Sequence, residues 1–197
     1  MPVAQATVGR DPATASRAGK YLTFRLGDES YGISVLKVRE IMRHTNTTVV
    51  PQMPDYIKGV INLRGKIIPV VDLLLKFGMA GGGDTDHTCI VVVQVARADH
   101  TRFSIGLVVD DVEEVANITA QNLEETPDFG VRLDTAYILG IAKIKGVVKT
   151  LLDIDKVITA ETVQLATPSS SIALLTKNTK AVGQTEKTYL NIKPENL

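Results

Sequence analysis

The chain contains an internal repeat, which limits the folds open to it more than any other feature of its sequence. Tyr56–Phe77 aligns without a gap on Tyr137–Ile158, and five paired positions are identical: Tyr56/Tyr137, Ile57/Ile138, Gly59/Gly140, Gly65/Gly146 and Asp72/Asp153. Upstream, Tyr31–Ile41 aligns in the same way on Ile105–Val115. Both blocks occur in the same order, so the sequence predicts two copies of one small domain. Their period is too long for a solenoid, whose repeats span roughly 20–50 residues.

Composition favours a cytoplasmic protein whose two halves depend on each other. The chain has 197 residues, of which 44% are hydrophobic, and a half of about 70 residues is marginal alone, so we expect a shared interface. The 22 basic and 22 acidic residues balance, which gives no electrostatic case for binding nucleic acid or an anionic membrane. Cys89 is the single cysteine, which fits a reducing compartment. The N-terminus does not resemble a signal peptide, and no apolar run approaches the ~20 residues of a membrane span.

Short strands and tight turns dominate the pattern of the chain. Tyr21–Leu26 and Tyr31–Val35 read as a hairpin, and Ile90–Val95 with Phe103–Val109 repeats it. In both copies the apolar positions change parity after the second strand, near Leu36 in the first copy. A bulge or sharp bend there would help a sheet to close into a barrel.

The second repeated block predicts a hairpin followed by one short helix. Val60–Leu63 and Lys66–Val71 are expected strands around the turn Arg64-Gly65, and Pro69 should put the second strand at an edge or a bulge. Asp72 should cap a helix over residues 73–77, and Asp153 a second helix over 154–158. Asp55 should cap a helical turn that ends at Gly59.

These elements together favour a mainly β fold of two packed small β-barrels with a few short helices. We expect a flexible N-terminal tail over residues 1–19, a first barrel half over 20–85 and a second over 86–159. Residues 160–197 fall outside both copies and are expected to form a partly disordered extension.

No pattern of residues indicates catalysis, a metal site or a cofactor. The histidines His44, His87 and His100 are scattered, and Cys89 near His87 lacks the further soft ligand that a metal site would need. No phosphate-binding loop or nucleophile elbow is present. The acidic residues around Glu113 read as a solvated strand end. A small-molecule-binding barrel or a hydrolase stays open as an alternative, but it would need polar residues converging on one pocket.

The run Gly59–Leu73, GVINLRGKIIPVVDL, closely resembles the CheW family of bacterial chemotaxis adaptors. FRLGDESYGISVLKVREI precedes this run and CIVVVQVARADHTRFSIGLVVDDVEEV follows it, so the resemblance covers about residues 20–159. It implies two SH3-like five-stranded barrels and a non-enzymatic adaptor without a cofactor, which couples transmembrane chemoreceptors to the histidine kinase CheA. It also implies a cytoplasmic protein recruited to membrane-associated receptor arrays. A scaffold for a non-flagellar pathway, such as twitching motility or biofilm control, would use the same surfaces.

The resemblance also suggests which residues meet the partners. The positions expected near the receptor are Val38, Glu40, Gly59, Arg64, Ile90, Gly106 and Val112. The kinase face is expected around Arg39 and Ile41, where a CheW-like domain of the kinase could pack barrel to barrel.

Each of these positions also has a purely structural interpretation. Val38 and Val112 occupy matching places in the two copies and could be core residues, and Gly59 could simply end its turn. Gly106 could mark a close approach of strands, and Arg64 could be an ordinary solvated turn residue. Glu40 is the expected ion-pair partner of Arg64.

Overall fold

The computed structural model describes residues 16–80, 83–97, 100–124 and 136–158. Its strands, in chain order, are β1 Gly19–Leu26, β2 Glu29–Ser34, β3 Val38–Arg43, β4 Ile57–Leu63, β5 Lys66–Asp72, β6 Cys89–Ala96, β7 Arg102–Val109, β8 Asp111–Ile118, β9 Leu123–Glu124, β10 Ile138–Ile144 and β11 Val147–Leu152. The described helices are short: the 3₁₀ helix η1 Val35–Lys37, α2 Leu73–Lys76 and α3 Ile154–Val157. The prediction of a mainly β fold is confirmed.

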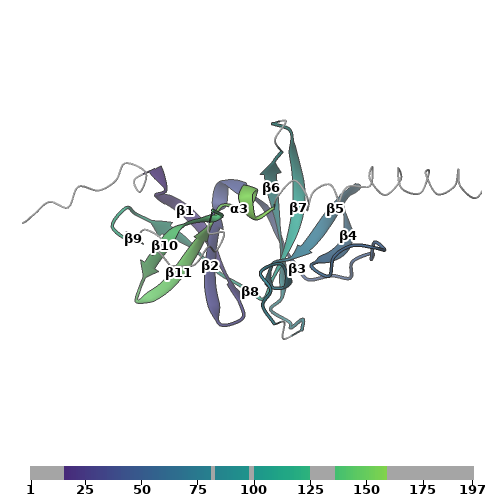
Figure 1. The fold of residues 1–197 in the computed structure, drawn as a ribbon, viewed down its shortest axis with the longest axis horizontal. Helices are drawn as coiled ribbons and strands as arrows, with labels where there is room; N and C mark the ends of the chain where they lie inside the picture. Colours follow the sequence, from purple (N-terminus) through teal and green to yellow (C-terminus); the bar gives the residue numbers. More distant parts are fainter. Residues whose placement is uncertain (1–15, 81–82, 98–99, 125–135, 159–197) are drawn as a thin grey trace, which may run out of the picture.

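The strands form two sheets that lie side by side (Figure 1). One is six-stranded, in the order β8-β1-β2-β11-β10-β9, and the other is five-stranded, in the order β3-β6-β7-β5-β4. A bridge between Thr48, which follows β3, and Val60 in β4 joins the two edges of the five-stranded sheet. The edges of the six-stranded sheet, β8 and β9, follow each other along the chain. We refer to the sheets as the six-stranded and the five-stranded barrel.

The repeat predicts one barrel half before residue 85 and one after it. The two barrels of the structure do not divide the chain there. The first copy gives β1 and β2 to the six-stranded barrel and β3–β5 to the five-stranded barrel, and the second copy does the reverse. Parallel pairings of β11 with β2 and of β5 with β7 join the two copies within each sheet. Each barrel is therefore built from both halves of the sequence.

The change of apolar parity marks the place where the chain passes from one barrel to the other. In the first copy η1 is the whole connection between β2 and β3, and in the second copy Asp110 alone separates β7 from β8. Neither connection reverses the chain as a hairpin turn does, and the strand that follows pairs in the other sheet. The parity change therefore marks a crossover between the sheets, and in both copies a register shift of the kind expected follows it, between Val38 and Glu40 in β3 and between Val112 and Glu114 in β8.

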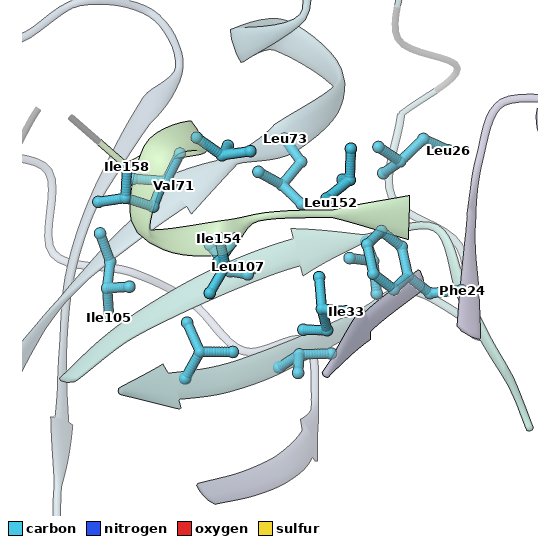
Figure 2. Packing of buried hydrophobic residues seen from close by; sticks show 14 of the residues in the cluster. Phe24, Leu26, Ile33, Val71, Leu73, Ile105, Leu107, Leu152, Ile154 and Ile158 are labelled. Carbon is cyan, nitrogen blue, oxygen red and sulfur yellow. The ribbon is translucent and has the colours of Figure 1, made fainter. Parts of the chain in front are cut away.

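A central hydrophobic cluster joins the two barrels. Phe24 and Ile33 come from the six-stranded sheet, Val71 and Leu107 from the five-stranded sheet, and all four are fully buried. Figure 2 shows these side chains with others that converge between the sheets. Smaller clusters fill each barrel, one around Ile118 and Leu151 and the other around Ile90 and Val70. Because the largest core is shared, the barrels stabilise each other.

The predicted helix caps are confirmed. Asp72 accepts a hydrogen bond from the Leu75 backbone N–H at 3.1 Å, and Asp153 accepts one from the Asp155 N–H at 3.2 Å. The helices that follow bury Leu73 and Ile154 in the central cluster. Asp side chains satisfy N–H groups that the first helical turn leaves free, so this local signal could be read from the sequence.

The expectations for Pro69 and for the two ends of the chain have different outcomes. Pro69 does not put β5 at an edge, but the pairing of β5 with β7 begins only at Val70, so the ladder loses no hydrogen bond there. The expected tail overlaps β1, which begins at Gly19, and residues 1–15 lie outside the described part. The expected extension, residues 160–197, also lies outside it.

Candidate partner-binding surfaces

Arg64 and Glu40 form an ion pair on the surface of the five-stranded barrel, as predicted. Arg64 sits at the tip of the β4–β5 hairpin with a positive φ of 52°, and its side chain is 79% exposed. Its guanidinium lies 3.1 Å from the carboxylate of Glu40 in β3, whose side chain is 29% exposed. A guanidinium held in this way still presents donors to a partner.

The second copy repeats this ion pair on the six-stranded barrel. Lys145 and Glu114 stand at the positions of Arg64 and Glu40 in the repeat, and their charged atoms lie 3.7 Å apart. Lys145 has the same positive φ of 52° at its hairpin tip. The two tips share a backbone and a charge pattern, but an ammonium cannot offer the planar fork of a guanidinium.

Val38 and Val112 are half-buried and pack against the central cluster. Val38 pairs with Val93 across β3 and β6, and Val112 pairs with Phe24 across β8 and β1. Both side chains therefore contribute to the core and also keep part of their surface in solvent. The structure supports the core interpretation of these two residues without removing them from the surface.

Arg39 and Ile41, the residues expected at the kinase face, are exposed on β3. The Arg39 guanidinium donates a hydrogen bond to the Gln94 side chain. Ile41 is 44% exposed, and Val115, its counterpart in the second copy, is 55% exposed. A matching aliphatic residue is therefore accessible on each barrel.

Gly59 is buried, and the prediction that it ends a helical turn is wrong. It lies in β4 with a φ of 128°, where a Cβ atom would come within 2.2 Å of the Thr48 carbonyl oxygen. Thr48 and Val60 exchange two backbone hydrogen bonds of 2.9 Å at this point. Gly59 can affect binding only by positioning the segment around Thr48, whose neighbour Val49 is 74% exposed.

Ile90 and Gly106 lie inside the five-stranded barrel, not on its surface. Ile90 is fully buried, and a Cβ atom on Gly106 would lie 2.9 Å from its Cγ2 atom. The expectation that they lie near a receptor is therefore not supported, and the close-approach interpretation of Gly106 holds. The continuous apolar run that contains Ile90 indicated a strand buried on both faces.

Sequence reasoning missed most of the exposed aliphatic residues, Leu36 and Val148 among them. These two are 85% and 54% exposed. Leu36 could have been found by comparing the copies, because Asp110 takes its place in the repeat. Val148 aligns with Ile67 of the first copy, which is 53% exposed. The apolar pattern of these two strands does not show which of their residues are exposed and which are buried.

A charged pair links a buried lysine of the six-stranded barrel to a partly exposed glutamate. The Lys149 ammonium lies 2.5 Å from the Glu113 carboxylate, which also accepts a hydrogen bond of 2.7 Å from Ser30. The Lys149 side chain is only 6% exposed. Burial alone would raise the pKa of Glu113, but these hydrogen bonds and the Lys149 charge outweigh it and hold the pKa below its ordinary value.

The described residues offer no constellation for metal chemistry. Within them, no group of three or more His, Cys, Asp or Glu side chains is close enough to hold a metal ion. Burial, with a smaller contribution from Asp111, raises the pKa of the Cys89 thiol, which makes it a poor nucleophile. No helix in the described part of the chain is long and apolar enough to cross a membrane.

Fold and surface together define a two-barrel β protein with an exposed ion pair at a hairpin tip of each barrel. The model of the CheW-like domain matches residues 20–162. The chain is 37% identical over 146 residues to the chemotaxis protein CheW of Klebsiella aerogenes, covering 74% of this chain and 85% of the relative. It is 32% identical over 154 residues to CheW of Rhizobium meliloti, covering 74% and 96%.

A solved structure agrees with these relatives. The scaffolding protein TtCheW of Thermoanaerobacter tengcongensis superimposes with a TM-score of 0.63 at 33% identity, covering 72% of this chain and 92% of that one. The chain therefore belongs to the CheW family, and the resemblance seen in its sequence is confirmed.

Proposed function

We propose that this chain is a non-catalytic adaptor that couples chemoreceptors to a CheA-type histidine kinase. Membership of the CheW family supports a scaffold in chemotaxis. The observation that carries the finer proposal is on β3, where a register shift between half-buried Val38 and Glu40 turns these two side chains to opposite faces, while Arg39 and Ile41 are exposed. One strand of a rigid two-barrel body can thus take part in two contacts.

The receptor-facing surface consists of Val38, Glu40, Arg64 and Val112, with Gly59 as a positioning residue. An aliphatic surface with a guanidinium at its margin suits a helix that carries an apolar stripe and an acceptor group. The kinase-facing surface contains Arg39 and Ile41. We propose that a barrel of the kinase packs on this exposed strand and covers Ile41. Both partners are proposed to be held in the cytoplasm, next to the receptor-bearing membrane.

Replacing Val38 tests whether the two surfaces are separate. Val38→Trp should block binding of the purified receptor signalling domain while kinase binding stays unchanged, because the added rings project only from the receptor-facing surface. Val147→Trp is the control, because Val147 is 49% exposed beside the β10–β11 turn of the six-stranded barrel, outside both proposed surfaces. Loss of both interactions together with a lower melting temperature would instead mean that Val38 acts only through the core.

A further inference from the structure

Leu36 is the most exposed large aliphatic side chain in the described part of the chain, at 85%. It sits on η1, where the chain crosses between the barrels, and the Val38 N–H closes this turn on the Val35 carbonyl. The backbone beneath Leu36 is therefore fixed at both ends by strands. A large apolar side chain held in water on a fixed support is typical of an anchor for a partner.

Positive charge surrounds this leucine. Lys37 is neutralised by Asp155, whose carboxylate also accepts the Ala96 N–H. Arg39 donates only to the neutral side chain of Gln94, and Arg102 is exposed; neither forms a salt bridge with any carboxylate in the described ranges. Two uncompensated cations thus flank Leu36 on a chain whose acidic and basic residues balance.

The shape of the surface favours side chains over a small metabolite. Leu36, Arg39 and Arg102 line one depression of about 210 Å³, together with Lys37, Gln94 and Ala96. Pockets that enclose a drug-sized molecule measure roughly 300–1,000 Å³. This depression can accept one or two side chains, and a wider one of about 330 Å³ that also includes Leu36 is lined by Arg17 and Lys20.

We propose that Leu36, Arg39 and Arg102, which we call the Leu36 patch, bind an acidic amphipathic segment of a partner protein. An apolar side chain of that segment covers Leu36, and its carboxylates pair with the two guanidinium groups. The proposal deepens the proposed function, and rests on it, because Arg39 belongs to the kinase-facing surface. Asp110 replaces Leu36 in the second copy, so the two copies do not both carry such a patch, and a partner bound at Leu36 is received in one orientation.

A synthetic peptide tests the patch without receptor or kinase. The probe is a fluorescent helical peptide with leucine along one face and glutamate beside it, titrated into the full chain and followed by anisotropy and by amide chemical shifts. Shifts should centre on Leu36, Arg39 and Gln94. The affinity should fall about tenfold or more in Arg39→Glu/Arg102→Glu and in Leu36→Ser, because each loses a main contact. Added salt should weaken binding of the wild-type chain.

The matched control is Arg43→Glu/Lys66→Glu, which makes the same change of charge at exposed positions outside the patch. Equal weakening by this control, or equal binding of a peptide with serine in place of leucine, would overturn the proposal. The proposal would also be overturned if the chain sediments as a dimer and Leu36→Ser makes it a monomer, because a second copy of the chain would then cover the Leu36 patch. If the peptide fails while receptor and kinase are still coupled, the patch is wrong and the proposed function stands.

Discussion

At the scale of single residues, Arg64 is the side chain on which receptor recognition is proposed to depend most. Arg64→Ala should change the free energy of unfolding by less than about 0.5 kcal/mol, because the side chain is exposed at a turn. The affinity for the receptor should fall about thirtyfold, equivalent to ~2 kcal/mol. Calorimetric titration checks this, with Lys145→Ala as the control at the other tip. An unchanged affinity would remove Arg64 from the receptor-facing surface.

The Lys149–Glu113 pair makes a second prediction at the residue scale. Lys149→Ile, which copies Ile68 of the first copy, leaves the partly exposed Glu113 without its cation and should cost about 1–2 kcal/mol, between the values typical of exposed and of buried pairs. Replacing both residues by apolar ones in Lys149→Ile/Glu113→Leu should cost much less, because no unpaired charge is left. Urea denaturation measures both. A double variant as unstable as the single one would contradict this.

The same pair should also make stability depend on pH. The folded state holds the pKa of Glu113 below the unfolded value of about 4.3. Its stabilising contribution is therefore complete above that pH and is lost as the pH falls through the lower folded pKa. Urea midpoints from pH 7 to pH 3 should fall more steeply for the wild type than for the double variant. Parallel curves would show that Glu113 is not involved.

At the scale of elements, Gly59 holds β4 against the segment that follows β3. Gly59→Ala should lower the free energy of unfolding by about 1–3 kcal/mol, because alanine rarely adopts a positive φ and its Cβ meets the Thr48 carbonyl. The amide of Val60 should then exchange with solvent faster. Gly140→Ala is the matched control, since its Cβ would lie 3.2 Å from the Glu124 carbonyl oxygen without a positive φ. Equal losses in both variants would refute this role of Gly59.

Local elements could be predicted from the sequence because their causes are local. Asp72 and Asp153 cap their helices through neighbours in the chain, and the hairpin turn at Arg64-Gly65 needs only its own residues. The Arg64–Glu40 pair was within reach because the resemblance supplied both residues.

Long-range pairing and burial could not be predicted in the same way. The parallel ladder between β11 and β2 leaves no local signature, and the repeat is equally compatible with separate and with exchanged barrels. For that reason the boundary at residue 85 was misplaced. Ile90 and Gly106 were placed at a surface because the resemblance does not distinguish binding residues from core residues.

At the scale of the whole molecule, the exchange of strands means that neither half can fold alone. A fragment of residues 1–85 lacks β6 and β7 of the five-stranded barrel, and a fragment of residues 86–197 lacks β1 and β2 of the six-stranded barrel. Each fragment should be unfolded by circular dichroism, and an equimolar mixture should regain β structure and a cooperative melting transition. A fragment that melts cooperatively alone would contradict the shared core.

In the proposed function, one molecule holds receptor and kinase at the same time without chemistry of its own. The most direct test is co-sedimentation of purified kinase with receptor-bearing membranes as the adaptor concentration rises. Sedimented kinase should increase with adaptor, pass through a maximum and fall when excess adaptor occupies each partner separately. If kinase sediments equally with and without the chain, the chain does not couple receptor to kinase.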